Sequence, residues 1–155
     1  RDKKNFFILS CDCFGFFEKL RFKKFIERKK PDVVLFAFKI TELQKILFNA
    51  HSSIKLKHNN IESINVKKSL NNSGELGHAG FFWVRNGNIF DNLKRFNLSS
   101  NLKREIILDD YFKFLFDKKL CKMSCYKLNN YTHIGSISEY KELKYWQNYF
   151  KNENE

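Results

Sequence analysis

The sequence predicts a single α/β domain in which a layered sheet is flanked by helices. Three consecutive segments predict this class. Phe6–Ser10 is a short apolar strand that runs into Asp12. Phe16–Lys30 has apolar side chains at helical spacing and ends in a cluster of cations before Pro31, the only proline, which suits a helix C-terminus. Asp32–Lys39 is a continuous apolar run, typical of a strand that is buried on both faces of a sheet.

Together these segments form a βαβ unit, in which we expect the second strand to run parallel to the first. Further elements follow without an internal repeat or a low-complexity linker. In order, we expect a helix over Thr41–Phe48, strands over Ser53–Lys57, Glu62–Lys68 and Ala79–Val84, helices over Ile89–Phe96 and Glu105–Lys119, a strand over Leu120–Leu128, and a last helix over Ile137–Phe150. His58, Asn59 and Asn60 suit a hairpin turn, because Asn tolerates positive φ. Ser136 and Glu139 have the spacing of a capping box at the start of the last helix.

Length and composition describe one globular domain of ordinary size. The chain has 155 residues, 43% of them hydrophobic and 30% charged, which is enough to bury a core. We place the domain at residues 1–150 and expect residues 151–155 to be a disordered tail. No stretch approaches the roughly 18 apolar residues that a membrane-spanning helix needs, so we expect no membrane partner.

The net charge of +12 and the pI near 9.6 raise the question of a polyanionic partner. The lysines are spread along the whole chain, and arginines are few beside them. A chain rich in Lys, Asn, Phe and Ile can also reflect AT-biased codon usage. We therefore do not expect nucleic acid to be the partner, although a basic nucleic-acid-binding domain stays an alternative.

Four cysteines form the patterns C-x-C (Cys11, Cys13) and C-x-x-x-C (Cys121, Cys125). Neither has the C-x-x-C spacing of a zinc knuckle or a thioredoxin-type site. We interpret them as buried free cysteines, which fits a reducing cytoplasm.

Asp12 is the first candidate site residue. In open α/β sheets, ligands bind beyond the carboxyl ends of the strands, so Asp12 is well placed to hold a divalent metal or a ribose. Asp is also a preferred helix cap, and capping or turn formation is the competing interpretation. Elsewhere, no glycine-rich phosphate loop or G-x-S-x-G elbow occurs. The Lys67–Lys68 pair at a strand end either binds a phosphate or is simply solvated.

Six stretches, taken in order, resemble the sugar-phosphate nucleotidyltransferases, the enzymes that make nucleotide sugars. They are FFILSCDC, PDVVLFAFK, IESINVKKSL, HAGFFWV, REIILDDYFKFLFDKKLCKMSCYKL and NYTHIGSISEYKELKYWQ. In the family, the first ends in a magnesium-binding aspartate, the third in Glu-Lys-Pro, and the fourth carries a glycine that lies against the sugar. The resemblance implies a Rossmann-like layered mixed sheet flanked by helices.

The resemblance also implies roles for individual residues. Asp12 would hold Mg²⁺, Lys68 would contact the sugar phosphate, and Gly80 would line the sugar site. His133 stands where many members have a second metal-binding aspartate. Lys67 stands where the family has a glutamate beside the phosphate-binding lysine, and we count it among the substrate-binding residues.

The chain departs from the family pattern at its start. The family's glycine-rich nucleotide loop should lie upstream of Arg1 and is absent from the sequence, so the domain is expected to be incomplete at its N-terminus and to correspond to the acceptor-binding portion. Ser69 replaces the proline that follows the lysine. The implied function is transfer of a nucleoside monophosphate from a nucleoside triphosphate to a sugar phosphate or a similar small phosphorylated acceptor, in the cytoplasm. A non-catalytic partial domain that acts as a binding or regulatory module is the alternative. The sequence leaves a homo-oligomer open.

Overall fold

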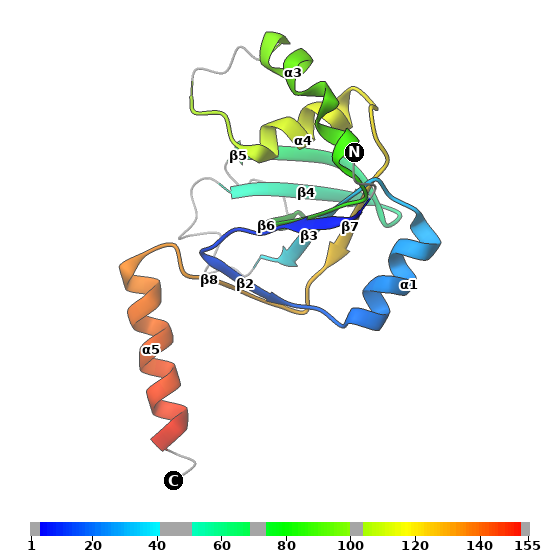
Figure 1. The fold of residues 1–155 in the computed structure, drawn as a ribbon. Coiled ribbons are helices and arrows are strands. Elements are labelled where there is room, and N and C mark those ends of the chain that lie inside the picture. Colours follow the sequence, from blue (N-terminus) through cyan, green and yellow to red (C-terminus); the bar gives the residue numbers. More distant parts are fainter. Residues whose placement is uncertain (1–3, 41–50, 69–73, 100–103, 153–155) are drawn as a thin grey trace.

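A computed structural model describes residues 4–40, 51–68, 74–99 and 104–152 (Figure 1). A six-stranded mixed sheet forms its centre, in the order β5-β4-β6-β3-β7, with β1 also paired to β6. The strands of this sheet are β1 (Phe6–Ile8), β3 (Val33–Lys39), β4 (His51–Lys57), β5 (Asn60–Lys68), β6 (Leu76–Val84) and β7 (Met123–Lys127). The α/β class predicted from the sequence is confirmed.

Helices cover both faces of this sheet, as Figure 1 shows. One face carries α1 (Lys19–Lys29), and the other carries the 3-10 helix η1 (Gly87–Asn92), α3 (Leu93–Ser99) and α4 (Leu108–Asp117). The last helix of the described residues, α5 (Ile137–Asn152), leaves the body of the domain. The predicted helix over Thr41–Phe48 lies outside the described residues.

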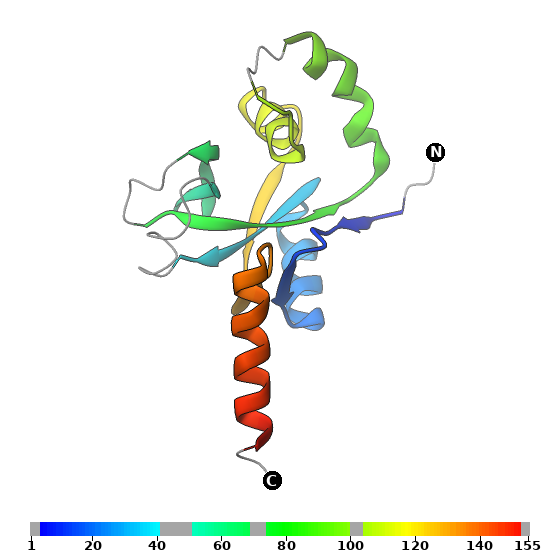
Figure 2. The ribbon, with the colours of Figure 1, turned by 90° about the vertical axis from the view of Figure 1, so that its left-hand side faces the viewer.

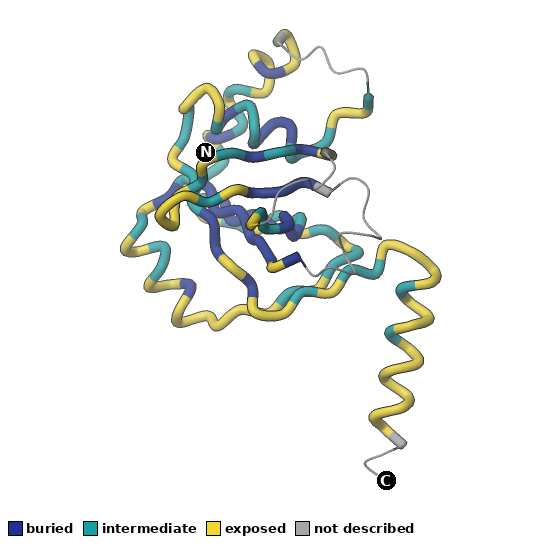
Figure 3. The backbone as a smooth tube through the Cα atoms, turned by 180° about the vertical axis from the view of Figure 1, so that it is seen from behind, coloured by how far each residue is buried: buried dark blue, intermediate teal, exposed yellow. Residues whose placement is uncertain are grey.

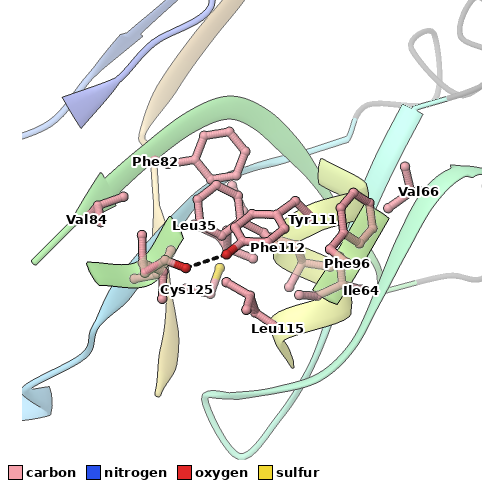
Figure 4. Close-up of a cluster of buried hydrophobic side chains, with 14 residues drawn as sticks. Leu35, Ile64, Val66, Phe82, Val84, Phe96, Tyr111, Phe112, Leu115 and Cys125 are labelled. Carbon is pink, nitrogen blue, oxygen red and sulfur yellow. Dashed lines mark hydrogen bonds between the residues drawn. The ribbon is translucent and has the colours of Figure 1, made fainter. Parts of the chain in front are cut away.

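The central strand β3 is buried on both faces, as its apolar run predicts. Val33, Leu35 and Ala37 belong to the core under α4, and the alternate residues Val34 and Phe36 belong to the core under α1. Figure 4 shows the first core, in which the Tyr111 hydroxyl donates a hydrogen bond to the backbone oxygen of Ile89. The second core is built from Phe22, Val34, Phe36, Phe38, Ile40, Ala79, Phe81, Trp83, Tyr126 and Leu128.

The opening βαβ prediction is correct in direction, but the two strands are not neighbours. Both β1 and β3 pair antiparallel with β6, which lies between them. They therefore run the same way, on opposite edges of β6. The strand that is paired in parallel with β3 is β7, which the sequence places some ninety residues later in the chain.

The β4–β5 hairpin forms where the sequence predicts it. His58 and Asn59 are its turn, with φ of 49° and 62°. Positive φ at both central residues is the conformation of the two-residue turns that match strand twist. The prediction that Asn would be tolerated there is confirmed for Asn59, whereas Asn60 already pairs with Lys57 as the first residue of β5.

A second, two-stranded sheet is absent from the sequence-based expectations. β2 (Cys13–Phe16) pairs antiparallel with β8 (Asn130–His133). The sequence pattern suggested that a helix begins at Phe16, whereas α1 begins at Lys19. Apolar side chains at helical spacing did not separate the strand residues Phe14 and Phe16 from the helix that follows.

Helix α5 projects away from the sheet, and Figures 2 and 3 show it in profile and coloured by burial. Its aromatic side chains are largely exposed, Tyr145 at 62% and Trp146 at 46%. By contrast, Trp83 on β6 is 3% exposed. No described helix is long and apolar enough to cross a membrane.

The cysteines are free, as expected, but their burial differs from the expectation. Cys125 is buried, Cys13 and Cys121 are half-buried, and Cys11 is exposed. The exposed position of Cys11 follows from its place in the tight turn after β1, where its side chain packs into neither core.

Candidate functional site

Asp12 lies in the turn between β1 and β2, seven residues before α1 begins. It therefore does not cap that helix, and the turn interpretation is the correct one of the two structural alternatives. The Ser10 hydroxyl donates a hydrogen bond to its Oδ1. This hydrogen bond is the largest cause that lowers the pKa of Asp12, and the partial burial of the carboxylate opposes it.

The β2–β8 pair brings His133 to Asp12, although the two residues lie far apart in the sequence. Cys13 stands directly opposite His133 in the register, and the Ile134 N–H donates to the backbone oxygen of Asp12 at 2.7 Å. The His133 Nε2 lies 3.5 Å from Asp12 Oδ2. The two metal-binding residues that the resemblance implies are therefore neighbours.

Cys13 completes this cluster. Its Sγ is 3.3 Å from Asp12 Oδ1 and 3.2 Å from the Tyr131 hydroxyl oxygen. Burial raises the pKa of Cys13 to about 11. Donor atoms of Asp12, Cys13 and His133 all lie within 4.8 Å of one another.

Gly80 fixes the position of the turn that carries Asp12. It has φ of 71° and lies at a register shift between β3 and β6, where the pairing moves from Leu35 opposite Phe82 to Ala37 opposite His78. A Cβ at this position would come within 3.1 Å of Ser10 Cβ. Glycine lets the Gly80 carbonyl oxygen accept a hydrogen bond from the Ser10 N–H at 3.2 Å.

Lys67 also has a left-handed backbone, with φ of 46°. It lies at a bulge between β4 and β5, where the pairing shifts between His51 opposite Lys68 and Ser53 opposite Asn65. Bulges change the direction in which side chains point, and they are frequent beside functional sites. The Lys68 backbone ends β5, and its side chain lies outside the described part of the chain.

The buried His78 pairs with the half-buried Asp109 beside these residues. His78 Nδ1 is 3.4 Å from Asp109 Oδ2. Burial by itself would raise the pKa of Asp109, but hydrogen bonds from His78 and Ser52, together with the charge of Lys67, lower it below its ordinary value. The His78 Nε2 is buried without a hydrogen-bond partner among the described residues.

One pocket of about 180 Å³ unites the residues described above. Its lining is Ser10, Asp12, Cys13, Ser52, Lys67, His78, Ala79, Gly80, Ile107, Asp109, Tyr131 and His133. Four of the five residues predicted from the sequence are in this set, and Lys68 is the one whose side chain is not described. A larger cavity, of about 750 Å³, lies between α1, β7 and the hairpin turn and contains none of the five.

Sequence reasoning missed several residues of this pocket. Cys13 was interpreted as a structural thiol, and Asp109 and Tyr131 received no role. Behind the pocket, Glu139 has only a helix-capping role in the sequence pattern, although its carboxylate also reaches His133 Nδ1 at 3.0 Å. The nearest signal was the C-x-C pattern beside Asp12, which placed a thiol next to a carboxylate without showing that an imidazole lies across from them.

The donor set does not fit the Mg²⁺ that the resemblance implies. Mg²⁺ takes oxygen ligands in near-ideal octahedral geometry, usually one or two carboxylates with waters and substrate phosphates. In this cluster Asp12 offers such a ligand, but the other two donors are a thiol and an imidazole. An imidazole and a thiol suit borderline and softer divalent metals.

Comparison with known proteins gives a likeness of fold without a likeness of sequence. No protein-family model matches the sequence, and a search of curated proteins finds no match. Solved structures do match. A UDP-glucose pyrophosphorylase complexed with UDP-glucose aligns with a TM-score of 0.69 at 14% identity, over 97% of this chain and 57% of that one.

Two further structures match in the same way. A nucleoside-diphosphate-sugar pyrophosphorylase from Vibrio cholerae aligns with a TM-score of 0.64 at 13% identity, over 89% of this chain and 55% of that chain. The inositol-1-phosphate CTP transferase from T. maritima aligns with a TM-score of 0.62 at 16% identity, over 90% of this chain and 52% of that chain. The chain thus spans about half the length of the solved structures that it matches. By its fold, it resembles the sugar nucleotidyltransferases, as its sequence predicted.

Proposed function

We propose that this chain is the acceptor-binding part of a nucleotidyltransferase. The reaction would transfer a nucleoside monophosphate from a nucleoside triphosphate to a sugar phosphate or a similar small phosphorylated acceptor. An acceptor phosphate oxygen attacks the α-phosphorus, the bond from that phosphorus to the bridging oxygen breaks, and pyrophosphate leaves. The observation that carries the proposal is the single pocket lined by Asp12, Lys67, Gly80 and His133.

The pocket suits the phosphorylated end of an acceptor. Lys67 offers a flexible cation, and Lys68, the last residue of the same strand, is its neighbour in sequence. The main chain at Gly80 permits close approach, because no side chain projects there. At about 180 Å³, the space is well below the 300–1,000 Å³ or so that usually holds a whole small-molecule ligand, so the nucleotide needs further residues.

The contribution of these residues would be positioning and neutralisation of charge. Attack of one phosphate on another brings negative groups together, and catalysis depends on holding them in line and balancing their charge. A lysine at the acceptor phosphate serves both purposes, because its ammonium fixes the oxygen that attacks and offsets the negative charge around it.

Calorimetric titration tests the proposal on the chain as it stands. Glucose 1-phosphate and inositol 1-phosphate serve as acceptors, and the common nucleoside triphosphates serve as donors. We expect an acceptor to bind and Lys67→Ala to weaken its binding roughly ten-fold or more, since a hydrogen bond to a charged group contributes about 1.5–3 kcal/mol. Lys57→Ala removes the same charge from an exposed position at the hairpin end of β4 and should leave the affinity unchanged.

Other outcomes have definite meanings. Binding of an acceptor with little triphosphate affinity supports an acceptor-binding part. Tight binding of one triphosphate would mean that the chain builds a nucleotide site without the glycine-rich loop. Failure to bind any acceptor would overturn the proposal and favour a non-catalytic module.

A further inference from the structure

The cluster of Asp12, Cys13 and His133 has the spacing of a metal site. Ligand atoms at two corners of a tetrahedron around Zn²⁺ lie about 3.5 Å apart, given metal–ligand bonds of about 2.0–2.3 Å. Two contacts of the cluster have this spacing: His133 Nε2 lies 3.5 Å from Asp12 Oδ2, and Cys13 Sγ lies 3.3 Å from Oδ1, the other oxygen of the same carboxylate. One donor atom from each of the three residues lies within 4.8 Å of the other two.

Groups behind the donors hold them in place. Glu139, in the first turn of α5, accepts a hydrogen bond from His133 Nδ1 at 3.0 Å and from the Ser136 hydroxyl at 2.8 Å. A carboxylate on one ring nitrogen of a histidine orients the other nitrogen toward a metal and makes it more basic, as metalloproteins use widely. The Tyr131 hydroxyl lies 3.2 Å from Cys13 Sγ in the same supporting role.

The backbone around His133 also leaves room for its ring. A Cβ at Gly135 would lie 2.4 Å from His133 Cε1 and 3.4 Å from Asp12 Oδ2. Any larger residue at position 135 would displace the imidazole from the carboxylate. Three separate features of the fold thus hold the site together: the register of β2 with β8, the first turn of α5 and the glycine at position 135.

We propose that Asp12, Cys13 and His133 bind a borderline transition metal, with Zn²⁺ as the type case, in preference to Mg²⁺. One carboxylate oxygen, one thiolate sulfur and one imidazole nitrogen form a mixed donor set that hard, oxygen-seeking Mg²⁺ disfavours. Three protein ligands on a tetrahedral ion leave a fourth position for water or for an oxygen of a bound compound. The inference rests on the geometry of this cluster and is independent of the proposed reaction.

Metal titration of the purified chain tests the inference without any assay of activity. We expect Zn²⁺ to bind with one tight site and Mg²⁺ to fail to displace it at large excess. Co²⁺ in place of Zn²⁺ should give visible bands of tetrahedral geometry and a near-ultraviolet thiolate-to-metal charge-transfer band. Cys13→Ser should abolish the charge-transfer band, whereas Cys11→Ser, which removes an exposed thiol outside the cluster, should leave it intact.

A second variant keeps the test decisive if Cys13→Ser does not fold. Glu139→Gln retains the helix and removes only the carboxylate behind His133, and loss of such an outer partner typically weakens metal binding by about 10- to 100-fold. Glu142→Gln, one turn later on the exposed side of α5, is its matched control and should have no effect. Mg²⁺ that competes equally with Zn²⁺, or a charge-transfer band that survives Cys13→Ser and vanishes with Cys11→Ser, would overturn the proposal.

Discussion

Gly80→Ala should lower the free energy of unfolding, because it strains the backbone that positions the site. The backbone at Gly80 has φ of 71°, and an L-residue in that region costs about 1–2 kcal/mol. The new Cβ would also meet Ser10 Cβ at 3.1 Å, and relieving such a contact costs of the order of 0.5–1.5 kcal/mol if a side chain leaves its rotamer. The lower entropy of the unfolded alanine chain offsets about 0.4–1 kcal/mol.

The net expectation is a loss of about 1–2 kcal/mol in the free energy of unfolding. For a domain of this size, that corresponds to a fall in Tm of about 2–8 °C, which far-ultraviolet circular dichroism resolves. Gly87→Ala is the matched control, because nothing lies within 4 Å of a Cβ built there and its φ is not positive. Equal melting temperatures for the Gly80→Ala variant and the unmodified chain would refute the reasoning about the backbone at Gly80.

Three further predictions concern buried and exposed polar groups. Asp110→Ala should lower the free energy of unfolding by about 1–3 kcal/mol, because the carboxylate accepts hydrogen bonds from the Ile107 N–H at 3.0 Å and from Arg104 at 2.8 Å. Urea unfolding measures this loss, and the control Asp117→Ala, at an exposed ion pair, should lose under about 0.5 kcal/mol. The pKa of Asp109 in the folded state is lowered below its ordinary value of 3.8, so its carboxylate stabilises the fold above pH 3.8, and this stabilisation is lost as the pH falls through the lowered pKa. Asp109→Asn should therefore flatten the acid side of the profile of stability against pH, and an unchanged slope would contradict this. Exposed Cys11 should react first with a thiol reagent at mildly alkaline pH, while burial raises the pKa of Cys125 to about 12 and should make it the slowest; mass mapping of partly labelled protein gives the order.

The elements that the sequence predicted are those whose signal is local. The Asp32–Lys39 run identified β3, the 3.6-residue spacing before Pro31 identified α1, and the Asn-rich turn identified the hairpin. In each case a short stretch of sequence carries the whole pattern, so the element can be recognised without knowledge of the tertiary packing.

What the sequence did not reveal depends on register over long separations. Cys13 and His133 face each other because β2 pairs with β8, and neither four-residue strand has enough alternation to be recognised alone. The sequence therefore predicts two metal ligands, Asp12 and His133, whereas the structure brings three donors together, one of them a thiol. Asp109 reaches the pocket from the first turn of α4, a helix that the sequence predicts without indicating which of its polar side chains faces the site.

The contrast between the two tryptophans gives the protein a built-in pair of optical probes. Trp83 lies 3% exposed in the core beside α1, and Trp146 lies 46% exposed on the projecting α5. An aqueous quencher such as iodide should therefore reach the indole of α5 first and leave the blue-shifted emission of the core. Replacing Trp146 with Phe would make fluorescence a reporter of the sheet alone, so that melting of the helix and melting of the domain can be followed as separate events in one sample.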